Sequence, residues 1–207
     1  MYYSQANQDR WVCESLGFKR GGTFIDLGAY DGVQTSNTYF LEKELGWSGV
    51  CVEANPAIFQ QLLRNRCSIN LNLAVSDRAG TCFFSGDAIA GQAEGIQVPC
   101  DTLNHILEAC QAPAVIDYLS LDIEGHEFAV LHGFDFDRWR IRLMTVEHNL
   151  YCDGPEKKDR LYRLLTARGF ERVVDNAVCL DPNPQWFQQP YEDWYAHRSF
   201  LVNEAGQ

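Results

Sequence analysis

The stretch Thr23-Phe-Ile-Asp-Leu-Gly-Ala-Tyr-Asp-Gly32 decides the fold of this 207-residue chain. Its apolar residues Phe24, Ile25 and Leu27 are typical of a short buried strand, and Gly28 and Gly32 mark the loop that follows. Residues 36–45 repeat apolar side chains at helical spacing, which predicts a helix after the loop. A strand, a glycine loop and a helix in this order indicate an α/β domain, in which ligands bind at the carboxyl ends of the strands.

The spacing of the two glycines distinguishes between cofactors. The pattern is G-x-x-x-G preceded by Asp26, whereas a dinucleotide fingerprint requires G-x-G-x-x-G. A second apolar strand, residues 49–53, ends in Glu53, roughly 20 residues after the loop, where an acid binds the ribose hydroxyls of an adenosine. A ribose-binding acid without a phosphate cradle favours S-adenosylmethionine over NAD. The alternative is that the glycines only serve a turn and that Glu53 only caps a helix.

Composition restricts the partners and the compartment. The formal charge of −11, from 17 basic and 28 acidic residues, repels nucleic acid and anionic membranes, so neither is an expected partner. The eight cysteines include no C-x-x-C pair, and the chain has neither a secretory leader pattern nor an apolar run long enough for a membrane span. We therefore expect a cytoplasmic enzyme with reduced thiols. The sequence carries no pattern that indicates its oligomeric state.

The remaining pattern alternates apolar strands with amphipathic helices, which predicts a mainly parallel sheet with helices on both faces. The length fits a single domain over residues 1–207. Further strands are expected at 68–76, 81–84 (as a hairpin with 68–76), 117–122, 143–147, 170–175 and 199–202. Further helices are expected at 10–17, from Pro56 onward, at 101–112, from 127 to about 133, and at 156–168. In the helix that begins at Pro56, the residues expected to face the core are Ile58, Phe59, Leu62 and Leu63. Residues 1–20 are expected to form an N-terminal cap segment. Residues 85–97 and 176–198 are expected to form loops that face the acceptor, the molecule that receives the transferred group.

Two acids end neighbouring strands of the predicted sheet. Asp122 ends one strand and Glu147 the next, so both are expected in the cleft at the carboxyl edge, and Asn149 follows Glu147 by two residues. Carboxylate and amide oxygens are ligands that Mg²⁺ prefers. One hypothesis is that Asp122, Glu147 and Asn149 hold a divalent cation that binds the acceptor. The alternative is that the two acids only accept hydrogen bonds from loop amides.

Several segments together resemble the FkbM-type methyltransferases: SQxxQD (4–9), FIDLGAYDG (24–32), SNTYFLE (36–42), GWSGVCVEANP (46–56), LAVSDRAG (73–80) and YLSLDIEGHE (118–127). The resemblance implies a class I, Rossmann-like methyltransferase fold with seven strands, of which the last is antiparallel. It also implies S-adenosylmethionine as cofactor and O-methyl transfer to a sugar or another small molecule. The chain departs from the family at Tyr30, where Asn is usual, and Tyr is unfavourable at positive φ.

The resemblance also implies which residues contact the cofactor. The methionine end is expected over Gly28, Ala29, Tyr30 and Gly32, with Asp26 and Asp31 near its ammonium and Ser36, Asn37 and Thr38 near its carboxylate. Ser36 to Thr38 have the alternative role of a plain helix cap. Glu53 is expected at the ribose, and the adenine is expected beside Ala54, Asn55, Ala74, Val75, Ser76 and Asp77. Asp122 is expected to adjoin the cofactor as well.

Methyl transfer from a sulfonium to a hydroxyl requires alignment of the two atoms and removal of a proton by a base or with the help of a metal. His148 and His126 are candidate bases because imidazole titrates near neutral pH. Either Glu124 or Glu127 is expected to shape the acceptor pocket. Aromatic residues near the C-terminus either stack on a sugar or cover the sheet: Trp186, Phe187, Tyr191, Trp194 and Tyr195.

The function favoured by the sequence is S-adenosylmethionine-dependent methylation of a hydroxyl on a glycan or other small molecule. A protein or an amine acceptor remains open within this class. Two alternatives come from other classes: a Rossmann-type NAD(P)-binding oxidoreductase, and a cofactor-binding module without catalysis.

Overall fold

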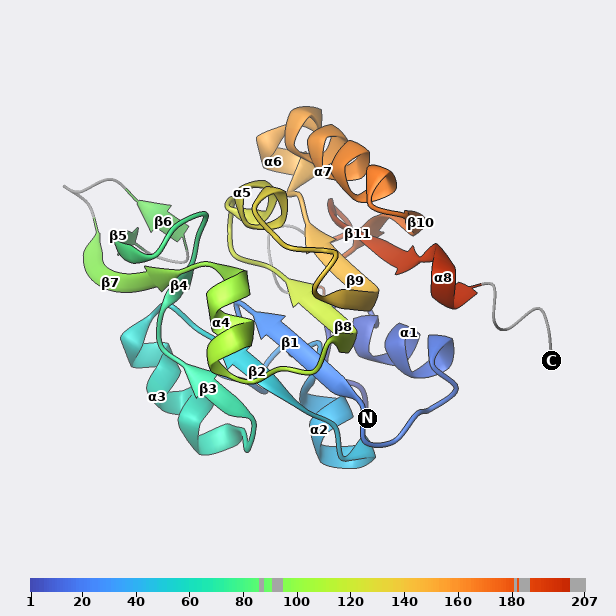
Figure 1. Cartoon of the computed structure of the whole chain (residues 1–207), viewed down its shortest axis with the longest axis horizontal. Coiled ribbons are helices and arrows are strands. Elements are labelled where there is room, and N and C mark those ends of the chain that lie inside the picture. Colours follow the sequence, from blue (N-terminus) through green and yellow to red (C-terminus); the bar gives the residue numbers. More distant parts are fainter. Residues whose placement is uncertain (86–87, 91–94, 181, 183–186, 202–207) are drawn as a thin grey trace.

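The computed structural model describes residues 1–85, 88–90, 95–180, 182 and 187–201. Its main sheet consists of β1 (Thr23–Leu27), β2 (Ser48–Val52), β3 (Ile69–Leu71), β8 (Val115–Leu121), β9 (Arg140–Glu147), β10 (Phe170–Val178) and β11 (Pro190–His197). The strand order is β10-β11-β9-β8-β1-β2-β3 (Figure 1). Neighbouring strands are parallel except at β11, which is antiparallel to both β9 and β10. The predicted seven-stranded sheet with an antiparallel last strand is therefore confirmed.

Helices cover both faces of this sheet, as predicted. One apolar cluster joins one face to α4 (Leu103–Ala109), α5 (Glu127–His132) and α7 (Pro155–Ala167). A second cluster joins the other face to α1 (Gln8–Ser15), α2 (Tyr39–Leu45) and α3 (Pro56–Asn65). In β1, Ile25 belongs to the first cluster and Phe24 to the second, because successive strand residues point to opposite faces. Two short helices complete the set: α6 (Leu150–Asp153) and α8 (Arg198–Leu201).

The predicted single strand at 68–76 is wrong, because this segment divides between two sheets. Its first part is β3, which pairs with β2, and its second part is β4 (Ala74–Val75) in another sheet. The side chain of Asn72, between the two parts, donates to the carbonyls of Glu53 and Ala54 at 2.8 and 3.1 Å. These hydrogen bonds hold the turn between β3 and β4 against the end of β2.

The second sheet has four strands in the order β4-β7-β5-β6, with β5 (Gly80–Ser85), β6 (Ala88–Ala90) and β7 (Ile96–Asp101). It lies at one end of the molecule, away from β10 and β11 (Figure 1). The hairpin between 81–84 and 68–76 was a wrong prediction, since β5 pairs with β6 and β7. The predicted loop 85–97 contains β6 and the start of β7, while its residues 86–87 and 91–94 lie outside the described residues. These segments are strands because their backbones pair with β5, and the alternation of apolar and polar residues in the sequence does not indicate this pairing.

The last strand lies earlier in the chain than predicted. β11 falls inside the segment 176–198 that was expected to be a loop, and the expected strand 199–202 is instead helix α8 up to Leu201, with Val202 outside the described residues. The strand was not predicted because it contains two consecutive acids, Glu192 and Asp193, which are typical of an exposed segment. Both are buried, with 2 % and 1 % of their surface exposed.

Three of the C-terminal aromatics belong to the core. Tyr191, Trp194 and Tyr195 are buried on β11, so they do not form an acceptor wall, and covering the sheet is their role. Phe187 is 37 % exposed, and Trp186 lies outside the described residues.

Two helix predictions need smaller corrections. Helix α2 begins at Tyr39 because the hydroxyl of Ser36 accepts the N–H groups of Thr38 and Tyr39 and keeps the preceding residues in the loop. Helix α3 begins at Pro56 as predicted, but Leu63 is exposed while Leu62 is buried. Among the described residues, no helix has the length and apolar character needed to cross a bilayer.

Candidate functional site

The loop after β1 is drawn tightly against the ends of its two neighbouring strands. The N–H groups of Gly28 and Ala29 both donate to the carbonyl of Val52, at 3.0 Å each. Gly28 has φ +85°, and a Cβ there would lie 1.7 Å from the carbonyl oxygen of Asp122. Glycine is therefore required at this position both for its backbone conformation and for the close approach of β8.

Glu53 connects this loop to the end of β2. Its Oε2 accepts the N–H of Tyr30 at 3.1 Å, and its Oε1 accepts the N–H of Asn55 at 2.6 Å. The carboxylate of Glu53 therefore holds the backbone of the glycine loop against the end of β2. Tyr30 adopts φ +50°, the left-handed conformation that the departure from the family pattern put in question.

Arg66 was missed by the sequence analysis. It follows α3, and its side chain is fully buried. Its Nε lies 2.7 Å from Oε2 of Glu42, and its guanidinium also donates to the carbonyl of Gly32 at 3.2 Å and to Ser36 Oγ at 3.3 Å. An arginine after an amphipathic helix has no sequence signal that distinguishes it from a surface residue.

The same guanidinium holds two predicted cofactor residues. Its Nη2 donates to Thr38 Oγ1 at 2.9 Å, and Thr38 Oγ1 donates to Oδ2 of Asp26 at 2.5 Å. Burial raises the pKa of Asp26, and the positive charge of Arg66 opposes this rise. Thr38 thus acts within a buried network that shapes the loop.

Cavities at the carboxyl edge of the strands share Gly28 and Asp122 as lining residues. One is bounded mainly by apolar side chains and by Glu53. Another is polar and includes Gln5 from the N-terminal segment. A third lies between Tyr30, Phe84 and Glu124 and connects the same groups. Together these cavities form one groove over the ends of β1, β2 and β8.

Most of the predicted cofactor residues line this groove: Asp26, Gly28, Ala29, Tyr30, Ser36, Asn37, Glu53, Ala54, Ala74, Val75 and Asp122. The remaining predicted cofactor residues are not among the lining residues: Asp31, Gly32, Thr38, Asn55, Ser76 and Asp77. Asp31 accepts the N–H groups of Val33 and Gln34, and Asn55 caps α3. Asn37 has a buried Oδ1 for which the described residues supply no hydrogen-bond partner.

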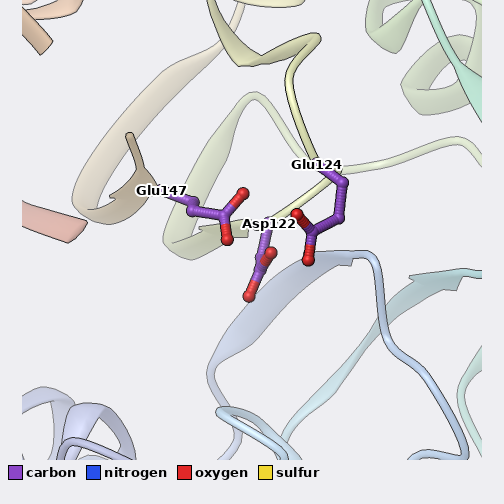
Figure 2. Close-up of side chains that lie close together, drawn as sticks. All are labelled: Asp122, Glu124 and Glu147. Carbon is purple, nitrogen blue, oxygen red and sulfur yellow. The ribbon is translucent and has the colours of Figure 1, made fainter. Parts of the chain in front are cut away.

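Three acids converge beside the groove, as Figure 2 shows. Asp122 and Glu124 lie in the loop after β8, and Glu147 ends β9; oxygens of the three carboxylates lie within 4.8 Å of one another. Burial raises the pKa of Asp122 to about 7, and the charge of Glu124 adds to this effect. Burial and the charge of Asp122 raise the pKa of Glu147 well above its ordinary value. The predicted meeting of Asp122 and Glu147 is thus seen in the structure.

Glu127 holds the backbone of the loop that carries Glu124. The Oε1 atom of this fully buried residue accepts the N–H groups of Ile123 and Gly125 at 3.2 and 3.0 Å. Its Oε2 atom pairs with Lys157 Nζ at 3.1 Å. Glu127 therefore positions the loop, while Glu124 is the acid that reaches the groove.

The two predicted histidine bases differ in their surroundings. The Nδ1 of His148 accepts the N–H of Leu150 at 3.1 Å, so its Nε2 carries the hydrogen and donates to Asp193 at 3.2 Å. His148 is 1 % exposed, and with both nitrogens engaged it does not fit the role of a base. His126 precedes α5, and its Nδ1 is buried without a hydrogen-bond partner among the described residues.

A further buried acid was missed because it lies within β11. Glu192 is paired with Glu147 in the register of β11 and β9, and it accepts the indole N–H of Trp194 at 2.6 Å. Burial raises its pKa to about 8, in spite of this hydrogen bond. Nearby, Gln8 donates to the hydroxyl of Tyr191 at 2.6 Å, so the N-terminal segment is tied to the same strand.

The strand order, the glycine loop and the acid after β2 define a class I methyltransferase fold. The sequence model described as the methyltransferase FkbM domain matches residues 26–172, and the chain belongs to this family. No curated protein matches the chain significantly.

Solved structures share the fold at low sequence identity. The methyltransferase FkbM from Methylobacillus flagellatus KT is 11% identical with a TM-score of 0.57, over 84% of this chain and 43% of that one. A putative O-methyltransferase from Klebsiella pneumoniae is 9% identical with a TM-score of 0.58, over 93% and 80% of the two chains. The METTL16 methyltransferase domain is 14% identical with a TM-score of 0.58, over 92% and 66%. The chain thus spans less than half of the length of the Methylobacillus protein.

Proposed function

We propose that residues 1–207 form one methyltransferase domain that transfers a methyl group from S-adenosylmethionine to a hydroxyl group of a glycan or another small molecule. Family membership supports methyl transfer from this cofactor. The observation that carries the cofactor assignment is Glu53, which lies at the end of β2 in the same cavity as Gly28. An acid in this position binds the ribose hydroxyls of an adenosine.

The groove offers a place for each part of the cofactor. The apolar cavity beside Val52, Val75 and Phe84 suits adenine. The resemblance implies a place for Asn37 at the carboxylate of the methionine end, but its unpartnered Oδ1 can only accept a hydrogen bond, so we assign it to the ammonium instead, within the polar cavity. A dinucleotide fits less well, because its pyrophosphate needs a helix N-terminus directly after the loop, and α2 begins only at Tyr39. When bound, S-adenosylmethionine supplies an activated methyl group on its sulfonium.

The acid cluster supports a hydroxyl acceptor. Asp122 lines all three cavities of the groove, so an acceptor placed beside the methyl group faces this carboxyl group. A base is most effective when its pKa lies near the working pH, and the pKa of Asp122, raised by burial to about 7, meets this condition. Carboxylates also accept hydrogen bonds from neutral hydroxyls and repel anions. We therefore assign proton removal to the acid cluster rather than to His148.

Calorimetric titration with S-adenosylmethionine, S-adenosylhomocysteine and NAD(P) tests the cofactor. We expect micromolar binding of the first two, weakened about 10-fold or more in Glu53→Gln, since hydrogen bonds to a charged group contribute about 1.5–3 kcal/mol. The matched control is Glu44→Gln, an exposed acid on α2, which should bind like the parent chain. Binding of NAD(P) in place of S-adenosylmethionine would instead identify an oxidoreductase.

The acceptor is tested with methyl-labelled cofactor and a panel of saccharides, polyols, amines and peptides. The proposal expects an alkali-stable methyl ether on a hydroxyl compound, and Asp122→Asn should lower turnover at least 100-fold while S-adenosylhomocysteine still binds. Label on an amine or a peptide would contradict the hydroxyl acceptor. Cofactor binding without turnover on any acceptor would favour a module without catalysis.

A further inference from the structure

We propose that Asp122, Glu124 and Glu147 form a binding site for one hard divalent cation, Mg²⁺ or Mn²⁺. The inference deepens the proposed function and rests on it for the role of the cation, while binding of the cation is independent of that function. The three acids come from the ends of two neighbouring strands, β8 and β9, and converge as Figure 2 shows.

The spacing of the carboxylates fits such an ion. Their oxygens lie within 4.8 Å of one another. An octahedral ion with ligands at about 2.1 Å places neighbouring oxygens about 3 Å apart and opposite oxygens about 4 Å apart. A small inward rotation of the side chains therefore satisfies the geometry. Three carboxylates form a set of hard oxygen ligands that suits Mg²⁺ or Mn²⁺ rather than a softer metal.

The strongest sign of a missing partner is the side chain of Glu147. It is 4 % exposed and points into the cluster, yet no donor among the described residues hydrogen-bonds to its Oε2. A buried carboxylate oxygen without a partner is costly. Lys157 acts on Glu147 electrostatically, but its ammonium pairs with Glu127 and Asp153, at 3.1 Å each. A cation between the three acids would supply the missing partner.

The surrounding residues hold the ligands in place before the ion binds. The backbone on both sides of Glu124 is fixed by Glu127, which is itself paired with Lys157. Asn149 Nδ2 donates to Oε2 of Glu124 at 3.3 Å. The sequence-based hypothesis made Asn149 a ligand, but its amide nitrogen faces Glu124, so Asn149 is a positioning residue and Glu124 takes the third ligand position.

The open side of the site faces the groove. Asp122 and Glu124 both line the cavity that also contains Tyr30 and Phe84. Mg²⁺ usually keeps several water ligands, so its remaining positions would be available to water or to an acceptor hydroxyl. With the cation bound, Asp122 serves as a ligand instead of a base. Coordination lowers the pKa of the acceptor hydroxyl, so a weaker base such as water can take its proton.

Titration with Mn²⁺ alone, followed by the electron paramagnetic resonance signal of the free ion, tests the site. We expect one Mn²⁺ per chain, displaced by excess Mg²⁺. Glu124→Gln and Glu147→Gln should weaken binding at least 10-fold, and Asn149→Ala about 10-fold, as for other residues that orient a ligand. Glu44→Gln on α2 is the control and should bind Mn²⁺ like the parent chain.

The absence of saturable Mn²⁺ binding, or equal binding by parent and variants, would overturn the proposal. Because Glu124 is exposed, its variant is expected to fold and gives a result even if Glu147→Gln does not. The calorimetric titration with S-adenosylmethionine separates the two proposals. Cofactor binding without Mn²⁺ binding refutes the cation site alone, whereas Mn²⁺ binding without cofactor binding refutes the proposed function and leaves the cation site standing.

Discussion

Replacement of Arg66 by methionine should be among the most damaging single changes outside the groove. Methionine retains an unbranched side chain but removes the guanidinium that reaches Glu42 at 2.7 Å and Thr38 at 2.9 Å. It also removes the positive charge 4.0 Å from Asp26. Both acids lie in a buried environment, with 9 % or less of their surface exposed.

The expected loss in the free energy of unfolding is about 3–5 kcal/mol, the usual cost of removing one partner of a buried ion pair. This is a large fraction of a total stability of about 5–15 kcal/mol. The loss should affect binding as well, because Arg66 holds the carbonyl of Gly32 and the hydroxyl of Ser36 in the loop that borders the polar cavity. We expect the affinity for S-adenosylmethionine to fall about 10-fold, which corresponds to about 1.4 kcal/mol.

Urea denaturation measures the stability, and calorimetry measures the affinity. Arg64→Met is the matched control, because Arg64 is exposed at the end of α3, two residues before Arg66, and its replacement should cost no more than about 0.5 kcal/mol. Arg66→Lys should fall between the two, since lysine keeps the charge but loses the planar arrangement of donors. A loss below about 1 kcal/mol in Arg66→Met, at an unchanged dependence on urea, would refute the reasoning by showing that Glu42 and Asp26 find other partners.

Two further substitutions test the site's electrostatics and backbone. Because burial raises the pKa of Glu192 to about 8, the folded chain keeps a proton that the unfolded chain loses above its ordinary value of 4.5, so stability should fall as the pH rises between these values. Glu192→Gln removes this pH-dependent contribution. In urea titrations from pH 5 to 8, the free energy of unfolding of the variant relative to the parent should therefore increase by up to about 1.4 kcal/mol per pH unit. A difference between variant and parent that does not change with pH would contradict this prediction. Tyr30→Asn should raise the melting temperature and add about 1 kcal/mol, because Asn tolerates the left-handed conformation at φ +50° and the Tyr side chain is 42 % exposed. A lower melting temperature would mean that the Tyr30 ring packs more than its exposure indicates.

The cofactor half of the fold could be predicted because its signals are local. The glycine loop after β1 and Glu53 after β2 each follow their own apolar strand, and both lie where their positions in the sequence put them. Asp122 and Glu147 could be predicted to meet because parallel neighbours bring their carboxyl ends to the same edge.

The rest depended on contacts between distant residues. The two consecutive acids in β11 look exposed in the sequence, but Glu192 is buried beside Trp194 and Asp193 beside His148. The four-stranded sheet has no distinctive residue pattern, since the pairing of β5 with its neighbours is made by the backbone. Arg66 shapes the loop from a position 34 residues beyond Gly32, a separation across which no periodicity acts.

The contact between Gly28 and Asp122 has a thermodynamic consequence. The N–H of Asp122 donates to the carbonyl of Leu27 at 3.0 Å, and its own carbonyl lies directly against Gly28, so the loop over the cofactor and the first acid of the cluster form one body. If the proposed cofactor and the proposed cation both bind, a ligand that shifts the loop is expected to displace Asp122 as well, which would link the two binding events. Such linkage is reciprocal. If bound cofactor changes the affinity of the acid cluster for its ligand by some factor, the ligand at the acid cluster changes the affinity for the cofactor by the same factor.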